Sequence, residues 1–193
     1  LLRNFERAVV YNYRFGFCRH EKALLAAGVH LVGVDRIGAI VRLGRLLRDA
    51  GHTRIAIVFE GDGSVYAPAL RALGLDVTHV EGTTSVSERH TLPLDRAGKV
   101  LCRLHSNAGV TAAILNNEVS ALHAQRELVH AGVAVPAGMR LLCWSGGDVA
   151  AGMDPPVGAA KLPVERMTRS ALDLLDADSP PTRHVFEPEL HDC

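Results

Sequence analysis

Short runs of Val, Ile and Leu alternate along the chain with longer segments in which apolar residues recur at every third or fourth position. The short runs are typical of buried strands, and the longer segments have the period of amphipathic helices, several of them closed by glycine. Strands are predicted over Arg7–Tyr13, Val29–Val34, Arg54–Glu60, Asp76–Gly82, Val110–Leu115, Arg140–Trp144 and Arg183–Leu190. Helices are predicted over Glu21–Gly28, Asp35–Gly51, Val65–Gly74, Asn117–Gly132 and Val164–Asp178, with another near Pro93–His105.

Strands that alternate with helices at this spacing predict an α/β fold. Each strand–helix–strand unit forms a right-handed crossover, and the resulting parallel sheet is covered by helices on both faces. Ligands of such sheets bind beyond the carboxyl ends of the strands. The loops expected at this edge are Asp35–Gly38, Glu60–Ser64, Gly82–Ser87, Asn116–Glu118 and Trp144–Asp154.

The composition excludes some kinds of partner. Of the 193 residues, 48% are hydrophobic, and 21 basic residues balance 21 acidic ones, so there is no excess charge for binding nucleic acid. Cys18, Cys102, Cys143 and Cys193 form no CxxC pair, which favours reduced thiols and a cytoplasmic location. No signal peptide or membrane-spanning run is present, so we expect a soluble protein that binds no membrane.

A glycine turn after one predicted strand raises the alternative of a nucleotide site. Gly61-Asp62-Gly63 follows a strand and precedes a helix, and Glu81 ends the next strand, as in part of a dinucleotide-binding fingerprint. Tyr66 stands where that fingerprint has its third glycine and would crowd a phosphate. The turn therefore favours a plain strand–helix connection with Ser64 as helix N-cap, and a nucleotide-dependent enzyme stays the alternative.

Two further chemistries find little support. Ser145 precedes two glycines, but a nucleophile elbow needs glycine two positions earlier, where Cys143 stands. His123 and His130 are about two helical turns apart, too far to share one metal ion readily. We therefore predict no catalytic residue, no metal and no cofactor.

Small hydrogen-bonding residues and one tryptophan gather in the predicted edge loops. An indole face can stack on an apolar ligand face while amides and carboxylates take its hydroxyls, which is how a cleft binds a polar metabolite. Trp144 is equally typical of a packing aromatic, and Asn117 of a helix N-cap. The predicted ligand-binding residues are Asn117, Trp144 and Ser145, with Asp35, Ser64, Thr84 and Glu118 behind them.

Four segments, taken in order, resemble the effector-binding core of the lactose-repressor (LacI/GalR) family of bacterial transcription regulators. Gly51–Val58 resembles the family's Gly-His-x-x-Ile-Ala strand entry, and Gly109–Trp144 resembles its Asn-Asp strand–helix unit. Met153–Leu175 resembles the family's Pro-Pro crossover and the helix after it, and Pro180–Leu190 resembles its closing strand. The order and spacing of these segments make the resemblance specific.

The resemblance implies two periplasmic-binding-protein-like lobes of Rossmann type, each with a parallel sheet, and an effector in the cleft between them. The N-terminal lobe is expected to be incomplete, lacking one or two strand–helix units and a preceding helix-turn-helix. The implied assignment is residues 1–51 to the N-terminal lobe, 52–162 to the C-terminal lobe, 163–177 to an N-terminal-lobe helix and 178–193 to the return into the C-terminal lobe.

The positions that hold ligands in the family differ here. The family's helix-start arginine aligns with Pro68, and the aromatic residue of its next edge loop aligns with Thr84. Its Asn-Asp pair is Asn117-Glu118, and the aspartate of its Gly-Tyr/Phe-Asp turn is replaced by Ser145. Losing an arginine and a carboxylate removes two charge-assisted contacts of about 1.5–3 kcal/mol each. A typical sugar is therefore disfavoured relative to a less polar effector.

We therefore predict the effector-binding and dimerisation domain of a LacI-like regulator, not an enzyme. Effector binding would shift the relative orientation of the lobes and so control a helix-turn-helix absent from this chain. The homodimer is expected to form through the helices that contain Arg42–Ala50 and Ala121–Gly132. A degenerate domain that only dimerises is a third interpretation.

Overall fold

The computed structural model describes residues 7–14, 20–60, 63–82 and 94–192. The chain forms two compact units. Unit 1 comprises Leu1–Ala39 and Leu162–Glu189, and unit 2 comprises Ile40–Lys161 and Leu190–Cys193. Both are built from parallel strands and helices, so the predicted α/β class with parallel sheets is confirmed.

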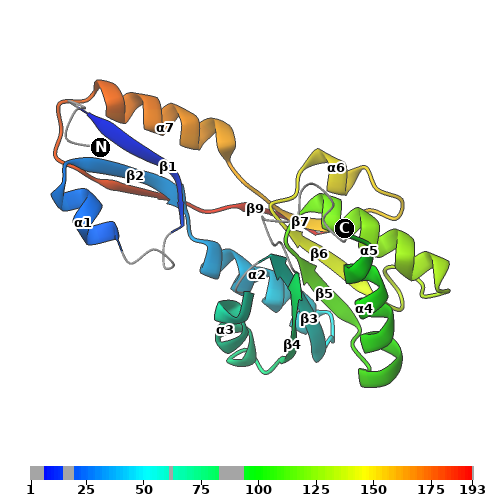
Figure 1. The fold of residues 1–193 in the computed structure, drawn as a ribbon. Helices are drawn as coiled ribbons and strands as arrows, with labels where there is room; N and C mark the ends of the chain where they lie inside the picture. The colour runs from blue at the N-terminus through cyan, green and yellow to red at the C-terminus, as the bar shows by residue number, and fades with distance from the viewer. Residues whose placement is uncertain (1–6, 15–19, 61–62, 83–93, 193) are drawn as a thin grey trace. The chain divides into compact units, whose positions relative to one another are not determined.

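Unit 1 is a small sheet with a helix on each face (Figure 1). Its strands, in the order β1 (Ala8–Arg14), β2 (Val29–Val34) and β8 (Arg183–Phe186), are parallel. Every residue of the central strand β2 is buried, which explains its continuous apolar sequence. Helix α1 (Glu21–Ala26) packs on the face that carries Val29 and Leu31, and α7 (Val164–Asp176) packs on the other face.

A buried histidine joins β2 to the start of β8. His30 is 4% exposed, and its Nδ1 accepts a hydrogen bond of 3.2 Å from the backbone N–H of Thr182. Because Nδ1 accepts, this bond requires a neutral imidazole with its proton on Nε2. Burial lowers the pKa of His30, and the nearby charges of His184 and Arg7 lower it further.

The stability of the protein is therefore expected to fall in mild acid. Below about pH 6.5 the unfolded chain binds a proton at His30 that the folded chain resists, so the free energy of unfolding falls until the lowered folded-state pKa is reached. His30→Asn keeps an acceptor at the position of Nδ1 but does not titrate. Urea unfolding between pH 7.5 and 5.5 should show a smaller loss for H30N than for the parent, and equal losses would contradict the assignment.

Unit 2 contains a sheet of six strands in the order β4-β3-β5-β6-β7-β9. The neighbouring strands β4, β3, β5, β6 and β7 all pair in parallel, and β9 lies at the edge of the sheet beside β7. The bounds are β3 Arg54–Glu60, β4 Asp76–Gly82, β5 Ala112–Leu115, β6 Arg140–Trp144, β7 Gly158–Lys161 and β9 Glu189–His191.

Helices cover both faces of this sheet (Figure 1). One face carries α2 (Arg36–Asp49) and α3 (Ala67–Arg71), and α3 follows the short 3₁₀ helix η2 (Gly63–Tyr66). The other face carries α4 (Leu94–Ala108) and α5 (Glu118–His130), with the four-residue helix α6 (Asp148–Ala151) beside α5. No helix among the described residues is long and apolar enough to cross a bilayer.

The structure corrects three predicted elements. The closing segment Arg183–Leu190 is not one strand: β8 and β9 belong to different sheets and are separated by Pro188, which has no N–H for a ladder. The predicted loop Trp144–Asp154 contains α6. Strand β7, Gly158–Lys161, was not predicted, because Gly-Ala-Ala has no β-branched residue to indicate a strand.

The compact units also divide at a different place from the predicted lobes. The division falls inside α2, between Ala39 and Ile40, rather than at Gly51. Most of α2 packs within unit 2, where Gly44 lies directly against Leu70 of α3. The predicted assignment of residues 1–51, 52–162, 163–177 and 178–193 to family lobes stays a prediction.

Candidate functional site

Two loops meet at the carboxyl edge of the six-stranded sheet. Strands β5 and β6 are parallel neighbours, with Leu115 paired to Cys143, so the residues that follow them emerge at the same edge. The backbone N–H of Gly147, in the loop after β6, donates a 2.9 Å hydrogen bond to Oε2 of Glu118, the first residue of α5, which follows the loop after β5. The structure therefore brings four predicted site residues together here, namely Asn117, Glu118, Trp144 and Ser145.

Asn117 is the N-cap of α5. Its backbone is extended, and its Oδ1 accepts a 2.8 Å hydrogen bond from the N–H of Ser120. The cap satisfies one of the backbone donors that every helix leaves at its first turn. The N-cap interpretation of Asn117 is therefore correct. Among the described residues the amide nitrogen of Asn117 has no hydrogen-bond partner, so its role as a ligand contact stays a prediction.

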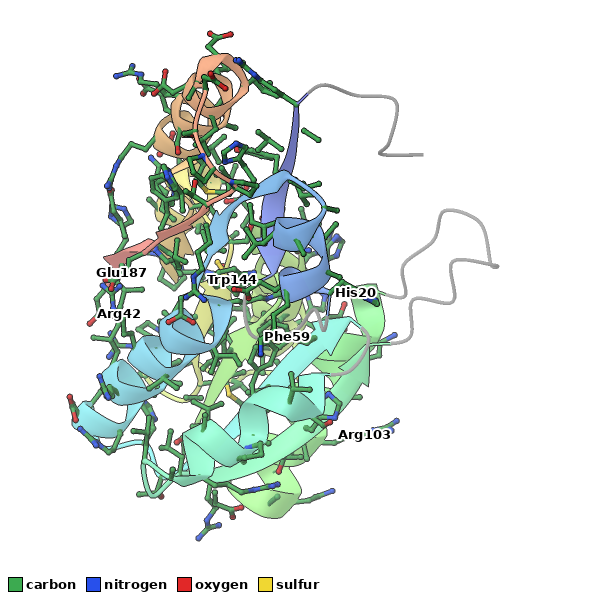
Figure 2. All side chains as sticks on the ribbon, turned by 90° about the vertical axis from the view of Figure 1, so that its left-hand side faces the viewer. His20, Arg42, Phe59, Arg103, Trp144 and Glu187 are labelled. Atoms are coloured by element: carbon green, nitrogen blue, oxygen red, sulfur yellow. The ribbon has the colours of Figure 1, made fainter. Side chains whose placement is uncertain are left out.

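Trp144, labelled in Figure 2, is the last residue of β6 and is 5% exposed. Since Leu142 pairs with Ile114, and Ile114 with Ile57, strand alternation places the Trp144 indole on the α2–α3 face of the sheet. This burial shows that the indole packs into the domain. Stacking of Trp144 on a ligand stays a prediction.

Ser145 begins a tight turn that leads into α6. Its φ is +57°, in the left-handed region that non-glycine residues adopt rarely, and its side chain is half-buried. The next residue, Gly146, is buried and donates its N–H to the carbonyl of Ala160 at 3.2 Å. Ser145 is therefore held at the sheet edge by its neighbours.

An ion pair flanks this turn. Lys161 at the end of β7 donates through Nζ to Oδ1 of Asp148, the first residue of α6, at 2.9 Å. The hydrogen bond and positive charge of Lys161 lower the pKa of Asp148. Asp148 lies in the predicted edge loop Trp144–Asp154, but its ion pair with Lys161 was not predicted, because nothing in the sequence indicates that residues thirteen positions apart would pair.

The remaining predicted residues lie elsewhere or outside the described part of the chain. Ser64 is exposed and lies inside η2, which follows β3 at the same sheet edge. The N-cap of α3 is Tyr66, so the prediction of Ser64 as N-cap was wrong. Asp35 belongs to unit 1, where its Oδ1 accepts from the N–H of Gly38 at 2.9 Å. Thr84 lies outside the described residues.

The glycine turn after β3 is only partly described. Gly61 and Asp62 lie outside the described residues. A Cβ at Gly63 would stand 2.8 Å from both Phe59 Cβ and His79 Nε2, so packing against the sheet accounts for glycine at this position. Tyr66 is 2% exposed and packs on Phe59 with ring centroids 4.9 Å apart. The nucleotide alternative stays a prediction.

The described residues show no group of three or more His, Cys, Asp or Glu that is arranged to hold a metal ion. Cys102 Sγ lies 3.8 Å from the carbonyl of Glu127, and Nδ1 of His105 lies 2.9 Å from the carbonyl of Val110. Both side chains therefore contact backbone carbonyls within unit 2.

A family model described as a periplasmic binding protein-like domain matches residues 45–191. The chain belongs to this family. The periplasmic-binding-protein-like domain spans most of unit 2 and all of α7 and β8, so it includes the paired loops after β5 and β6. A search of curated protein sequences gave no match.

Solved structures share the fold of this periplasmic-binding-protein-like domain. The transcriptional regulator CelR in complex with cellobiose is 24% identical, with a TM-score of 0.67 over 85% of this chain and 53% of that one. A LacI family regulator from Clostridium acetobutylicum is 15% identical, with a TM-score of 0.76 over 97% and 77%. A periplasmic binding protein/LacI regulator from Alkaliphilus metalliredigens QYMF, complexed with D-xylulofuranose, is 13% identical, with a TM-score of 0.69 over 85% and 64%.

The chain thus spans 53% and 64% of the two proteins solved with sugars. At these identities the likeness establishes the fold.

Proposed function

We propose that this domain is the effector-binding and dimerisation part of a LacI-like bacterial transcriptional regulator, located in the cytoplasm, and not an enzyme. The observation that carries the proposal is the meeting of the β5 and β6 loops, where Glu118 binds Gly147, at the sheet edge where parallel α/β folds bind ligands. Two structural neighbours described as regulators were solved with small carbohydrates, which supports a small-molecule effector.

The proposed effector is a small metabolite, sugar-like or less polar, bound at this edge. Oxygen and nitrogen atoms at the helix cap and the turn offer hydrogen bonds, and Pro68 stands where the resemblance places the family's arginine. A ligand that favours one relative orientation of the two units would shift their equilibrium. The proposed ligand-binding residues are Asn117, Trp144, Ser145, Asp35, Ser64, Thr84 and Glu118.

We propose a homodimer that forms through α5. Val119, Leu122 and Val129 are 49%, 48% and 56% exposed, and their spacing of three and seven residues places them on one face of the helix. By contrast, Leu43 and Leu47 of α2 are buried, so α2 uses its apolar face within its own fold. In this proposal DNA is bound by a helix-turn-helix segment outside the 193 residues.

The sole tryptophan of the chain offers a direct test, because Trp144 adjoins Ser145. Tryptophan emission is followed while cellobiose, D-xylulose, nucleosides and amino acids are added in separate titrations. We expect saturable quenching or a spectral shift with one class of metabolite, and a gain of about 2.7 kcal/mol in stability at a hundredfold excess over Kd. Micromolar binding of NAD(P) or ATP would instead favour the nucleotide-dependent enzyme, and no response to any compound would favour a domain that only dimerises.

Asn117→Ser provides the matched variant for this titration. Serine caps helices about as well as asparagine, so the melting temperature should change little. The variant lacks the amide nitrogen, so the affinity for the metabolite should fall about tenfold, as for the loss of one hydrogen bond. An unchanged affinity would remove Asn117 from the proposed ligand contacts.

A further inference from the structure

A side-chain-to-backbone hydrogen bond joins the two loops of the candidate site. Glu118 is the first residue of α5 and is half-buried, and its Oε2 accepts from the N–H of Gly147 at 2.9 Å. Gly147 is the N-cap of α6, where no side chain supplies a capping hydrogen bond. The bond connects residues that lie beyond the paired ends of β5 and β6.

The turn that this bond holds needs support. Ser145 has a left-handed backbone, which costs a non-glycine residue about 1–2 kcal/mol. Such a conformation persists only where surrounding contacts fix it. Here Gly146 donates its N–H to Ala160, and Gly147 donates its N–H to Glu118, so two successive backbone groups anchor the turn.

We infer that Glu118 is a positioning residue for the effector site: its carboxylate holds the Ser145–Gly147 turn against the start of α5 and so fixes where Ser145 is presented. The expected effect of Glu118 on ligand affinity rests on the proposed function. The hydrogen bond from Gly147 to Glu118 does not depend on that function, because it is present without a ligand. Glu118 thus acts through Gly147, in addition to any contact of its own with the effector.

Two conservative substitutions distinguish the positioning of the Ser145–Gly147 turn from the favourable effect of a negative charge in the first turn of α5. Glu118→Gln keeps an acceptor oxygen at the same reach and removes the charge. Glu118→Asp keeps the charge, which is favourable in the first turn of a helix, but is one methylene too short to keep the bond. Glu165→Ala is the control, because Glu165 is also in a first helical turn and pairs with Arg169 in unit 1.

The readout is hydrogen exchange of the Gly147 amide, measured by NMR on the full chain without ligand. We expect exchange about tenfold faster in E118D and in Glu118→Ala, and little change in E118Q or in E165A. Near-ultraviolet circular dichroism of Trp144 should follow the same order. Unchanged exchange at Gly147 in E118A, or equal acceleration in E118Q and E118D, would overturn the inference.

A second arm uses cellobiose as the probe. If it binds the parent, E118D should weaken its affinity about tenfold, and E118Q, which keeps an acceptor for the Gly147 N–H, should weaken it by a clearly smaller factor. Equal weakening in both variants would overturn the positioning role and assign the charge itself to the ligand. If cellobiose does not bind, cellobiose is excluded as the effector, and the exchange experiment still decides whether Glu118 holds the turn.

Discussion

Replacing Gly146 by alanine is expected to lower the free energy of unfolding by about 2–3 kcal/mol and to disturb the candidate site. A Cβ at Gly146 would stand 2.5 Å from both Ala159 Cβ and Cys143 Sγ, and 3.4 Å from Ala150 Cβ. Two of these atoms are alanine methyl groups fixed to the backbone of β7 and α6, so no rotamer change can move them away. Since the turn itself must shift, the emission of Trp144 should change as well. Urea unfolding and tryptophan fluorescence measure the two effects.

Gly147→Ala is the matched control for this prediction. A Cβ at Gly147 meets no heavy atom within 4 Å, and alanine keeps the N–H that binds Glu118. Its effect should therefore be smaller than that of G146A, since no atom has to move to make room for the methyl group. Adding Ala159→Gly to G146A removes one of the two closest atoms and should restore about 1 kcal/mol as a coupling energy. Equal losses for G146A and G147A, or no coupling with Ala159, would show that crowding at this turn is not the cause.

Much of the fold follows from patterns that the sequence displays directly. Strands β2, β3, β4 and β6 have the bounds predicted for them, because each is a Val-, Ile- or Leu-rich run bordered by polar or glycine residues. The short element β7 has no such signal. Its Gly158 lies close to Leu142 and to the carbonyl of His191, so small residues were selected by neighbours distant in the sequence.

The candidate site was predictable in its place but not in its contacts. That Asn117 caps α5 follows from its position before an amphipathic segment, and the structure shows the cap. The bond between Glu118 and Gly147 spans 29 residues and depends on the register of β5 with β6, which no local pattern encodes. The left-handed Ser145 is likewise set by the packing of Gly146, not by any preference of serine.

Gln125→Glu is expected to destabilise the domain by about 3 kcal/mol at pH 7.5. Gln125 on α5 is 4% exposed, and its Nε2 donates a 2.8 Å hydrogen bond to the carbonyl of Pro155. Its Oε1 is buried without a hydrogen-bond partner among the described residues. An ionised carboxylate here would place a carboxylate oxygen against the Pro155 carbonyl, with no hydrogen between these two acceptors. It would also bury a negative charge, and both effects lower the stability of the folded state. The loss should be measured by urea unfolding against the parent.

The pH dependence of the stability loss in Gln125→Glu shows whether the buried negative charge causes it. Burial raises the pKa of the introduced carboxyl in the folded state above its unfolded value of about 4.3, and the protonated group can donate to the Pro155 carbonyl. The folded variant therefore binds more protons than the unfolded chain, so its stability is highest in acid and falls as pH rises through the raised pKa. The difference from the parent should grow between pH 5 and pH 7.5.

Gln125→Met is the control, since it has a similar length but no polar atoms. It removes the donor to the Pro155 carbonyl and also the unpartnered Oε1, so a loss of about 1 kcal/mol, independent of pH, is expected. If Q125E and Q125M lose the same amount at every pH, the carboxylate must reach solvent. Helix α5 would then not pack closely against Pro155, contrary to the buried hydrogen bond between Gln125 and the Pro155 carbonyl.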